Sequence, residues 1–437
     1  MSISKCSLDY EAVQTVLDDI AQQANGWCHF SQRDRQMNAA QFTQLLVLGW
    51  LHHPQASLNE LALQSERLGF TISPQGLDAR ITERAVMLLA SVLRETLRYS
   101  YKRVPLANEK LASFSGILVT DSTQVRLPDA LRSVFKGVHG TTALKLQVTF
   151  DYLHGQIEMI DVTQGNQADQ TCQQPIVQAI PNSLNLFDLG YFKQEHLRDM
   201  DRQGAFFVTR YQSQTAIYDP DTGEKLALES WLARQTAHDL ERACLLGGRT
   251  RLPLRLVVRR LPQKVVNARR RKARDKARWE GKTCTKRHLE LLAWDILITN
   301  LPLAEWRLSE IFALYPIRWQ IELVFRVWKS QLGLARLGNW RIERILCQLY
   351  AHLIGAILGV HMTRAYRFQH AIEYSPAKLM DVICHFAIDL MQWITYRRPL
   401  SHPCFPQLER AFYRYARKDK RKKVPSTLQT FIHLGLS

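Results

Sequence analysis

Apolar positions in the first part of the chain recur every three or four residues, which is the spacing of one face of an α-helix. They are Phe42, Leu45, Leu46, Leu48 and Leu51, followed by Val86, Leu89, Val92, Leu93 and Leu97. Ser57 with Glu60 has the form of a capping box, and Ser73 before Pro74 places an N-cap ahead of a proline at the first helical position. The pattern predicts a helical amino-terminal domain over residues 1–110. The two short helices that follow these caps fit either a DNA-contacting helix-turn-helix or a plain bundle with a tight connection.

The pattern changes near residue 115 to an alternation with a period of two residues, which is typical of β-strands. Predicted strands cover residues 117–121, 144–152, 156–163, 184–187 and 205–210, and predicted helices cover residues 172–180 and 193–203. Three consecutive strands followed by alternating helix and strand are the order of a ribonuclease H-like fold. We therefore expect residues 111–211 to form the first part of an α/β, mixed-sheet core of this type.

Residues 212–307 do not continue the alternation of helix and strand. Two strand-like stretches, 252–258 and 291–298, flank a very basic connection. From Lys264 to His288, eleven Lys or Arg residues stand against two acids, so this segment carries half of the net charge of the chain. The length of the region far exceeds that of one crossover helix, which predicts a β-rich insertion into the core.

The remainder of the chain again has helical periodicity. Helices are predicted near residues 308–332, 340–366 and 376–396, followed by a basic tail at 414–423. We expect residues 308–372 to complete the core. Residues 373–437 are then a helical, basic carboxy-terminal region.

Charge and composition restrict the function. The formal net charge is +18 and the isoelectric point is about 9.7, which favours a polyanionic partner, most commonly nucleic acid. The eight cysteines form no Cys-x-x-Cys pair, and Cys284 with His288 lacks a second pair for zinc. Because the apolar stretch at 353–360 is too short to span a bilayer and the start of the chain is not a signal peptide, we expect a cytoplasmic protein with no membrane partner.

Four polar residues share a spacing in the segment that follows the insertion. Tyr315, Arg318, Glu322 and Lys329 lie at offsets of zero, three, seven and fourteen. On a continuous α-helix they fall within roughly 60° of one face. A buried carboxylate between two cations and a phenol is costly to desolvate, but it would suit a divalent metal with a phosphate. The alternative is a solvated amphipathic face that the i,i+4 pair of Arg318 and Glu322 stabilises.

Two aspartates follow apolar strands of the predicted core. Asp121 precedes Ser122-Thr123, where we expect a turn, and Asp188 precedes Leu189-Gly190. Open α/β sheets place their chemistry at the carboxyl ends of strands, although an isolated aspartate there is more often an N-cap or turn residue. Three acids in the middle strands are second choices as ligands. They are Asp151, Glu158 and Asp161.

The spacing of Tyr315, Arg318, Glu322 and Lys329 resembles the tyrosine-arginine-glutamate-lysine signature of bacterial transposases of the insertion-sequence-4 family. The resemblance extends to the blocks around Asp121 and Asp188. It implies a ribonuclease H-like catalytic core in which Asp121, Asp188 and Glu322 are catalytic and hold two Mg²⁺ or Mn²⁺ ions.

The resemblance also implies residues that bind DNA. Tyr315, Arg318 and Lys329 would grip a phosphate of the DNA backbone, and Trp319 is a candidate for stacking on an extruded base. We add Arg210, at the end of a strand, and the cluster Arg269, Arg270, Arg271 and Lys272 as further candidates for DNA contacts. The alternatives are core packing for Trp319 and ordinary solvated charges for the others. Trp279, Trp294 and Trp306 are further candidates for stacking.

The expected function is that of a cut-and-paste DNA transposase. Its partners would be the terminal inverted repeats of the element and the target DNA, held by a dimer in a synaptic complex near a bacterial nucleoid. Two alternatives stay open from the residues alone. One is a DNA-binding protein or inhibitor that has lost cleavage, and the other is a metal-dependent nuclease that cuts without joining.

Overall fold

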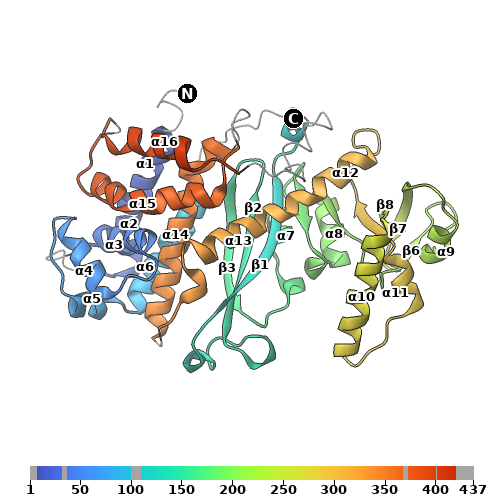
Figure 1. Cartoon of the computed structure of the whole chain (residues 1–437), viewed down its shortest axis with the longest axis horizontal. Coiled ribbons are helices and arrows are strands. Elements are labelled where there is room, and N and C mark those ends of the chain that lie inside the picture. Colours follow the sequence, from blue (N-terminus) through green and yellow to red (C-terminus); the bar gives the residue numbers. More distant parts are fainter. Residues whose placement is uncertain are drawn as a thin grey trace. The chain divides into compact units, whose positions relative to one another are not determined.

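The computed structural model describes residues 7–31, 37–99, 110–339, 341–367, 373–399 and 401–419. The chain divides into two compact units. Figure 1 labels the helices and strands that form them. Of the described residues, unit 1 contains those within 1–106, 122–167 and 320–424, and unit 2 contains those within 107–121 and 168–319. Each unit is therefore assembled from segments that are far apart in the sequence, and the two are described separately.

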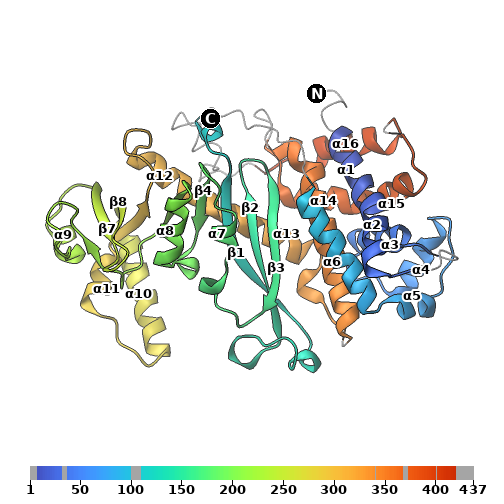
Figure 2. The same ribbon diagram turned by 180° about the vertical axis from the view of Figure 1, so that it is seen from behind.

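Unit 1 is mostly helical. Its amino-terminal helices are α1 (Ser7–Thr15), α2 (Ala21–Cys28), α3 (Ala39–His52), α4 (Leu58–Glu66), α5 (Pro74–Arg80) and α6 (Glu83–Arg98), and its carboxy-terminal helices are α13 (Gln320–Ser330), α14 (Ile342–Arg367), α15 (Pro376–Thr395) and α16 (Cys404–Tyr415). Helix α14 packs against α6 and α3, and α15 packs against α3 and α16 (Figure 2). The apolar periodicity of both ends of the chain thus builds one shared core.

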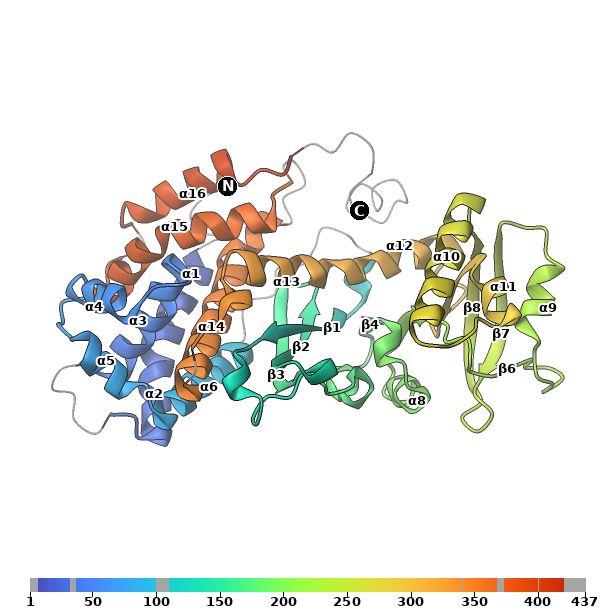
Figure 3. The same ribbon diagram turned by 60° about the horizontal axis from the view of Figure 1, so that its bottom comes forward.

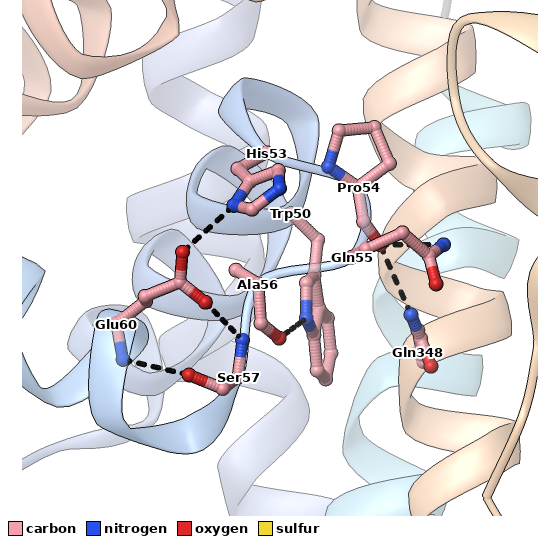
Figure 4. A network of polar contacts seen from close by, with 8 residues as sticks. All are labelled: Trp50, His53, Pro54, Gln55, Ala56, Ser57, Glu60 and Gln348. Atoms are coloured by element: carbon pink, nitrogen blue, oxygen red, sulfur yellow. Dashed lines mark hydrogen bonds and ion pairs between the residues drawn. The ribbon is translucent and has the colours of Figure 1, made fainter.

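The helix starts in unit 1 follow their capping residues. The Ser57 hydroxyl accepts from the Glu60 N–H at 3.2 Å, and the Glu60 carboxylate accepts from the Ser57 N–H at 2.7 Å, which confirms the predicted capping box (Figure 4). Ser73 caps α5 in the predicted position. In the loop before α4, the indole of Trp50 donates to the Ala56 carbonyl at 3.1 Å, and Gln348 of α14 donates to the Pro54 carbonyl at the same distance.

Helix α14 contains a stretch that is long and apolar enough to cross a membrane. It runs from Ile342 to Thr363 with a mean hydropathy of 1.6, and 83% of it is buried inside the structure. A helix that is apolar all round and surrounded by other helices has the character of a core helix.

Two strands of unit 1 form a hairpin. Strand β2 (Ala143–Asp151) pairs antiparallel with β3 (Gln156–Gln164), with an irregularity between Thr149 and Phe150. In the turn, the Asp151 carboxylate accepts from the Leu153 N–H at 2.8 Å and contacts the His154 ring. The buried Asp151 therefore has a role in closing the turn.

Unit 2 contains a large mixed sheet. Its strands are β1 (Ile117–Arg126, of which residues up to Asp121 belong to unit 2), β4 (Leu184–Phe187), β5 (Phe206–Arg210), β6 (Ile217–Tyr218), β7 (Asp239–Leu246), β8 (Leu252–Arg260) and β9 (Trp294–Thr299). Their order in the sheet is β1-β4-β5-β9-β8-β7-β6. The pairs β1–β4 and β4–β5 are parallel and the others are antiparallel.

The strands of residues 212–307 extend this sheet outward from β5. Strand β9 pairs with β5 on one side and with β8 on the other, so the fully buried side chains of Val208, Leu256 and Ile298 lie on neighbouring strands. The remaining helices of unit 2 are α7 (Gln174–Val177), α8 (Gln194–Arg202), α9 (Leu228–Ala233), α10 (Gln263–Trp279), α11 (Lys286–Leu291) and α12 (Leu308–Leu314). The basic connection of this region therefore forms two helices.

Candidate active site

The two aspartates of unit 2 lie at the carboxyl end of a parallel pair of strands. Residues 117–120 of β1 pair with residues 184–187 of β4, and the last pair is Thr120 with Phe187. Continued by one position, the register sets Asp121 beside Asp188. Neighbouring strands are about 4.8 Å apart, and residues in parallel register point to the same face. The site thus starts from two carboxylates at one edge of the sheet.

The local backbone around Asp121 differs from the prediction. We expected a turn at Ser122-Thr123, but β1 continues to Arg126 with Thr123 and Val125 buried and Gln124 and Arg126 exposed. The alternation of buried and exposed positions keeps the chain extended. The position of Asp121 is therefore set by the point at which β1 stops pairing with β4, and not by the end of β1 itself.

Asp188 ends β4 as predicted and begins a 3-10 turn at Leu189–Tyr191 (η7). Its carboxylate accepts a hydrogen bond from the Leu189 N–H at 2.8 Å, which is the ordinary behaviour of an N-cap aspartate. One carboxylate oxygen takes up this bond. Because a carboxylate accepts about four hydrogen bonds or ligand contacts, Asp188 retains capacity for a cation.

Arg318 contacts Asp121. Its Nη1 lies 3.2 Å from the Asp121 Oδ2, and only 4% of Arg318 is exposed. The guanidinium also lies over the ring of Trp319, at 4.8 Å from its centroid, while Trp319 itself is half exposed. A guanidinium presents its N–H donors in a planar fork, a geometry that suits both carboxylates and phosphates.

Tyr315 is buried in the same part of unit 2. The guanidinium of Arg210 lies 5.7 Å from the centre of its ring. Burial raises the pKa of Tyr315 to about 12, with Arg210 and Arg318 opposing the shift and Asp188 and Asp295 adding to it. The phenol therefore stays protonated and can act as a hydrogen-bond donor at neutral pH.

Two buried donors of this cluster have no protein acceptor. Within the described residues, the Tyr315 hydroxyl and the Arg210 Nε make no hydrogen bond. Buried polar groups are almost always paired in folded proteins, so unpaired donors beside an acidic pair indicate a place where a ligand supplies the acceptors. A phosphate has the required chemistry.

The segment that carries the four-residue spacing is not one continuous α-helix, in contrast to the prediction of a helix at 308–332. Helix α12 ends at Leu314, a 3-10 segment (η8) covers Tyr315–Trp319, and α13 starts at Gln320. Pro316 explains the change, because it has no N–H and its ring disfavours α-helical bonding to the preceding turn.

Glu322 and Lys329 belong to α13 in unit 1. Glu322 lies in the first turn and is partly exposed, and Lys329 lies in the last turn. Burial lowers the pKa of Lys329. Trp328, in contrast to Trp319, is a core residue with 1% of its surface exposed.

The carboxylates of Asp121 and Asp188 are of the ligand type that hard divalent cations prefer. Mg²⁺ and Mn²⁺ prefer carboxylate oxygens, and Asp121 and Asp188 present such oxygens at one sheet edge. Among the residues that the structure describes, no cluster of three or more His, Cys, Asp and Glu side chains has metal-binding geometry. Cys284, which the sequence pairs with His288, donates instead to the Ala273 carbonyl at 3.3 Å.

The basic cluster of α10 divides between two faces. Arg269 bonds to Asp295 at 3.4 Å, and Arg270 donates to the Leu289 carbonyl at 2.9 Å, so both hold α10 against its neighbours. Arg271 and Lys272 are exposed. Of the tryptophans weighed for stacking, Trp294 and Trp306 are buried and Trp279 is 79% exposed.

One acid of this region escaped the sequence analysis. Asp295 lies on β9, binds Arg269 and acts on the pKa of Tyr315. No sequence signal identifies it, because its relation to Tyr315 depends on β9 joining the sheet next to β5.

Comparison with known proteins gives a family match. The family described as "Transposase DDE domain" matches residues 112–358. The transposase for insertion sequence element IS231F of Bacillus thuringiensis subsp. israelensis is 26% identical over 356 residues, covering 75% of this chain and 74% of the relative. That for IS1151 of Clostridium perfringens is 24% identical over 354 residues, with 76% and 75% covered. A solved piggyBac transposase synaptic complex with hairpin DNA covers 96% of this chain and 86% of its own, with 11% identity and a TM-score of 0.46.

Proposed function

Because this chain belongs to the transposase DDE domain family, we propose that it excises an insertion sequence by a cut-and-paste mechanism and joins it to target DNA. Asp121, Asp188 and Glu322 are the catalytic carboxylates of this proposal, on a ribonuclease H-like core. The observation that supports it most strongly is the parallel register of β1 with β4, whose last pair, Thr120 with Phe187, directly precedes Asp121 and Asp188. The protein is a transposase, and the proposal concerns how it acts.

The carboxylates have the role of metal ligands. Asp121, Asp188 and Glu322 hold two Mg²⁺ or Mn²⁺ ions, for which carboxylate oxygens are the preferred ligands. When bound, such ions activate the attacking water or 3′-hydroxyl and stabilise the charge that develops on the phosphate. Asp121 also holds Arg318 in place, so the same carboxylate orders a cation that faces the DNA.

The neighbouring cations and the phenol bind the DNA backbone. Arg318 offers a planar fork of donors to a phosphate, while Tyr315 and Arg210 supply the buried donors that lack a protein acceptor. Lys329 adds a point charge on α13, and the half-exposed ring of Trp319 is available for stacking on a base. These groups position the scissile phosphate, and no covalent intermediate with the enzyme is required.

The DNA substrates follow from the reaction. Cleavage at the terminal inverted repeats frees a 3′-hydroxyl at each end, and each hydroxyl then attacks target DNA in line. Two ends must be held together for concerted insertion, so the working form is a dimer in a synaptic complex, acting on DNA in the cytoplasm.

Incubation of the purified protein with labelled element-end duplex, target DNA and Mg²⁺ tests the proposal. We expect cleaved ends and joined products, resolved on denaturing gels. Cleavage without joining would identify a nuclease instead. A gel shift with neither product would identify a DNA-binding protein that has lost catalysis.

Lys329→Ala is expected to weaken binding of end DNA and to reduce its salt dependence. Each phosphate contact that is lost lowers the slope of log K against log salt by about one unit. Fluorescence anisotropy over a KCl series measures the slope. The exposed Arg336 serves as a control, since Arg336→Ala changes the net charge equally. A slope unchanged from wild type would exclude Lys329 from the backbone contacts.

Tyr315→Phe is expected to leave the thermal midpoint unchanged or to raise it, because it removes a buried hydroxyl that has no protein partner. Cleavage should fall by about tenfold, the effect of losing one hydrogen bond of about 1.4 kcal/mol to the phosphate. The control is Tyr211→Phe, which removes a buried hydroxyl that donates to the Thr215 carbonyl. That variant should lose stability and keep its cleavage rate. Full cleavage by Tyr315→Phe would exclude the hydroxyl from substrate binding.

A further inference from the structure

Helix α10 has two faces of different character. The helix lies beside the strands of unit 2 (Figure 3). Its inner face contains the buried Val266 and the partly buried Ala273 and Ala277, and Arg269 and Arg270 anchor it to β9 and α11. Within the described part of the chain, the polar contacts of these two arginine side chains are all made to residues of unit 2. The contacts of the inner face therefore explain how α10 is attached to the rest of unit 2.

The outer face of α10 consists of exposed cations. We define it as Lys264, Arg271, Arg274 and Arg278, all of which are exposed. At 100° and 1.5 Å per residue, they cover roughly 80° of the helix surface and about 21 Å of its length. Asp275 is an exposed acid on the same side of the helix. The exposed Lys272 and Lys276 lie along one edge of the outer face.

Ion pairing does not explain this face. Other cations of the region have acidic partners, such as Lys276 with Glu280 at 3.7 Å and Arg287 with Glu229 at 3.3 Å. Over the described residues, the side chains of the four outer-face cations take part in no ion pair or hydrogen bond. Concentrated unpaired charge of one sign repels itself, which favours a partner that carries the opposite charge.

We infer that the outer face of α10 is a docking surface for the phosphate backbone of duplex DNA, separate from the residues that hold the scissile phosphate. Duplex DNA carries one charge per about 1.7 Å of axis when both strands are counted, so a duplex segment as long as this face, about 21 Å, carries about twelve phosphate charges. Flexible cations on a convex helix contact phosphates without reading bases. This surface therefore adds affinity for DNA that does not depend on the base sequence. The inference rests on the proposed function only in taking DNA as the partner.

The assignment also separates the basic cluster into two roles. Arg271 belongs to the DNA-contacting face, whereas Arg269 and Arg270 stabilise the attachment of α10. Lys272, on the flank, is exposed but lies away from the centre of the outer face. The four adjacent basic residues of the sequence thus do not act as one group.

The test replaces the four outer cations together by glutamine, which retains helix propensity. The variants are built in a Glu322→Gln background, so that cleavage plays no part in the measurement. Binding to element-end duplex and to an unrelated duplex of equal length is followed by anisotropy over a KCl series. The salt slope should fall by about three to four units on both duplexes, at about 0.9 unit for each lost contact.

A matched control removes four exposed charges elsewhere in unit 2. It replaces Lys225, Arg249, Lys282 and Lys286 by glutamine. Its slope should fall by less than about one unit. Circular dichroism and thermal melting verify that both variants are folded.

Three results would overturn the inference. The first is an unchanged slope in the outer-face variant, and the second is an equal fall in the control, which would indicate net charge alone. The third is a loss confined to the element end, which would indicate base recognition. Because the assay measures binding only, failure of the proposed cleavage reaction would be seen separately in the assay with wild-type protein and Mg²⁺.

Discussion

Replacing the carboxylate of Asp121, Asp188 or Glu322 by the corresponding amide is expected to abolish DNA cleavage, and the changes at Asp188 and Glu322 should leave DNA binding nearly unchanged. An amide is a weaker ligand for a hard divalent cation and carries no charge to hold it. Metal ions provide several kcal/mol of charge stabilisation to such reactions, so we expect a loss of at least about a thousandfold in rate.

The measurement compares single-turnover cleavage of labelled end DNA with the dissociation constant of the same DNA. Asp161→Asn and Glu158→Gln are the controls, because they make the same chemical change on β3, where the sequence also offered ligand candidates. Both controls should cleave at the wild-type rate. If Asp161→Asn were inactive and Asp121→Asn active, the assignment of the carboxylates would be wrong.

Asp121→Asn has an additional consequence that Asp188→Asn lacks. It leaves the nearly buried Arg318 without the carboxylate that faces it at 3.2 Å. Removing one partner of an ion pair that is shielded from water costs stability, because the remaining charge loses a favourable interaction. Asp121→Asn should therefore lower the thermal midpoint more than Asp188→Asn does, and this difference reports on the link between Asp121 and Arg318.

The sequence identified both aspartates and the strands before them because each follows a short run in which three of four residues are apolar. It did not reveal that β1 continues for five residues beyond Asp121. Ser and Thr read as a turn signal in isolation, yet Thr123 and Val125 bury alternate side chains against neighbouring structure. The end of the β1–β4 ladder is set by the length of β4, which no pattern within β1 can show.

The basic run after Lys264 concealed a helix for a related reason. Apolar periodicity is the main signal for a helix, and α10 has only Val266, Ala273 and Ala277 on its inner face. Two arginines take the place of apolar anchors there by bonding to Asp295 and Leu289. Such contacts depend on the tertiary structure and leave no periodic trace in the sequence.

Acid is expected to destabilise unit 1 through His352. This residue lies on α14 beside Trp50, with ring centres 6.1 Å apart, and burial lowers its pKa to about 3, with the Pro54 backbone opposing the shift. Neither ring nitrogen makes a hydrogen bond within the described residues. In the unfolded chain His352 binds a proton near pH 6.5, whereas in the folded chain it does so only near pH 3. The free energy of unfolding is therefore highest above pH 6.5 and decreases as the pH falls toward 3.

The slope of this effect is about 1.4 kcal/mol per pH unit, which gives a loss of about 2 kcal/mol between pH 6.5 and about pH 5. His352→Leu should remove this part of the pH dependence and should keep or raise stability at neutral pH, because it replaces an unpaired polar ring by an apolar side chain. His53→Gln, at an exposed site, should retain the wild-type dependence. Thermal melting over this pH range measures all three proteins. Titration of the ¹³C-labelled His352 ring in the wild-type protein measures the pKa directly, and a value near 6.5 would show that its burial does not couple folding to pH.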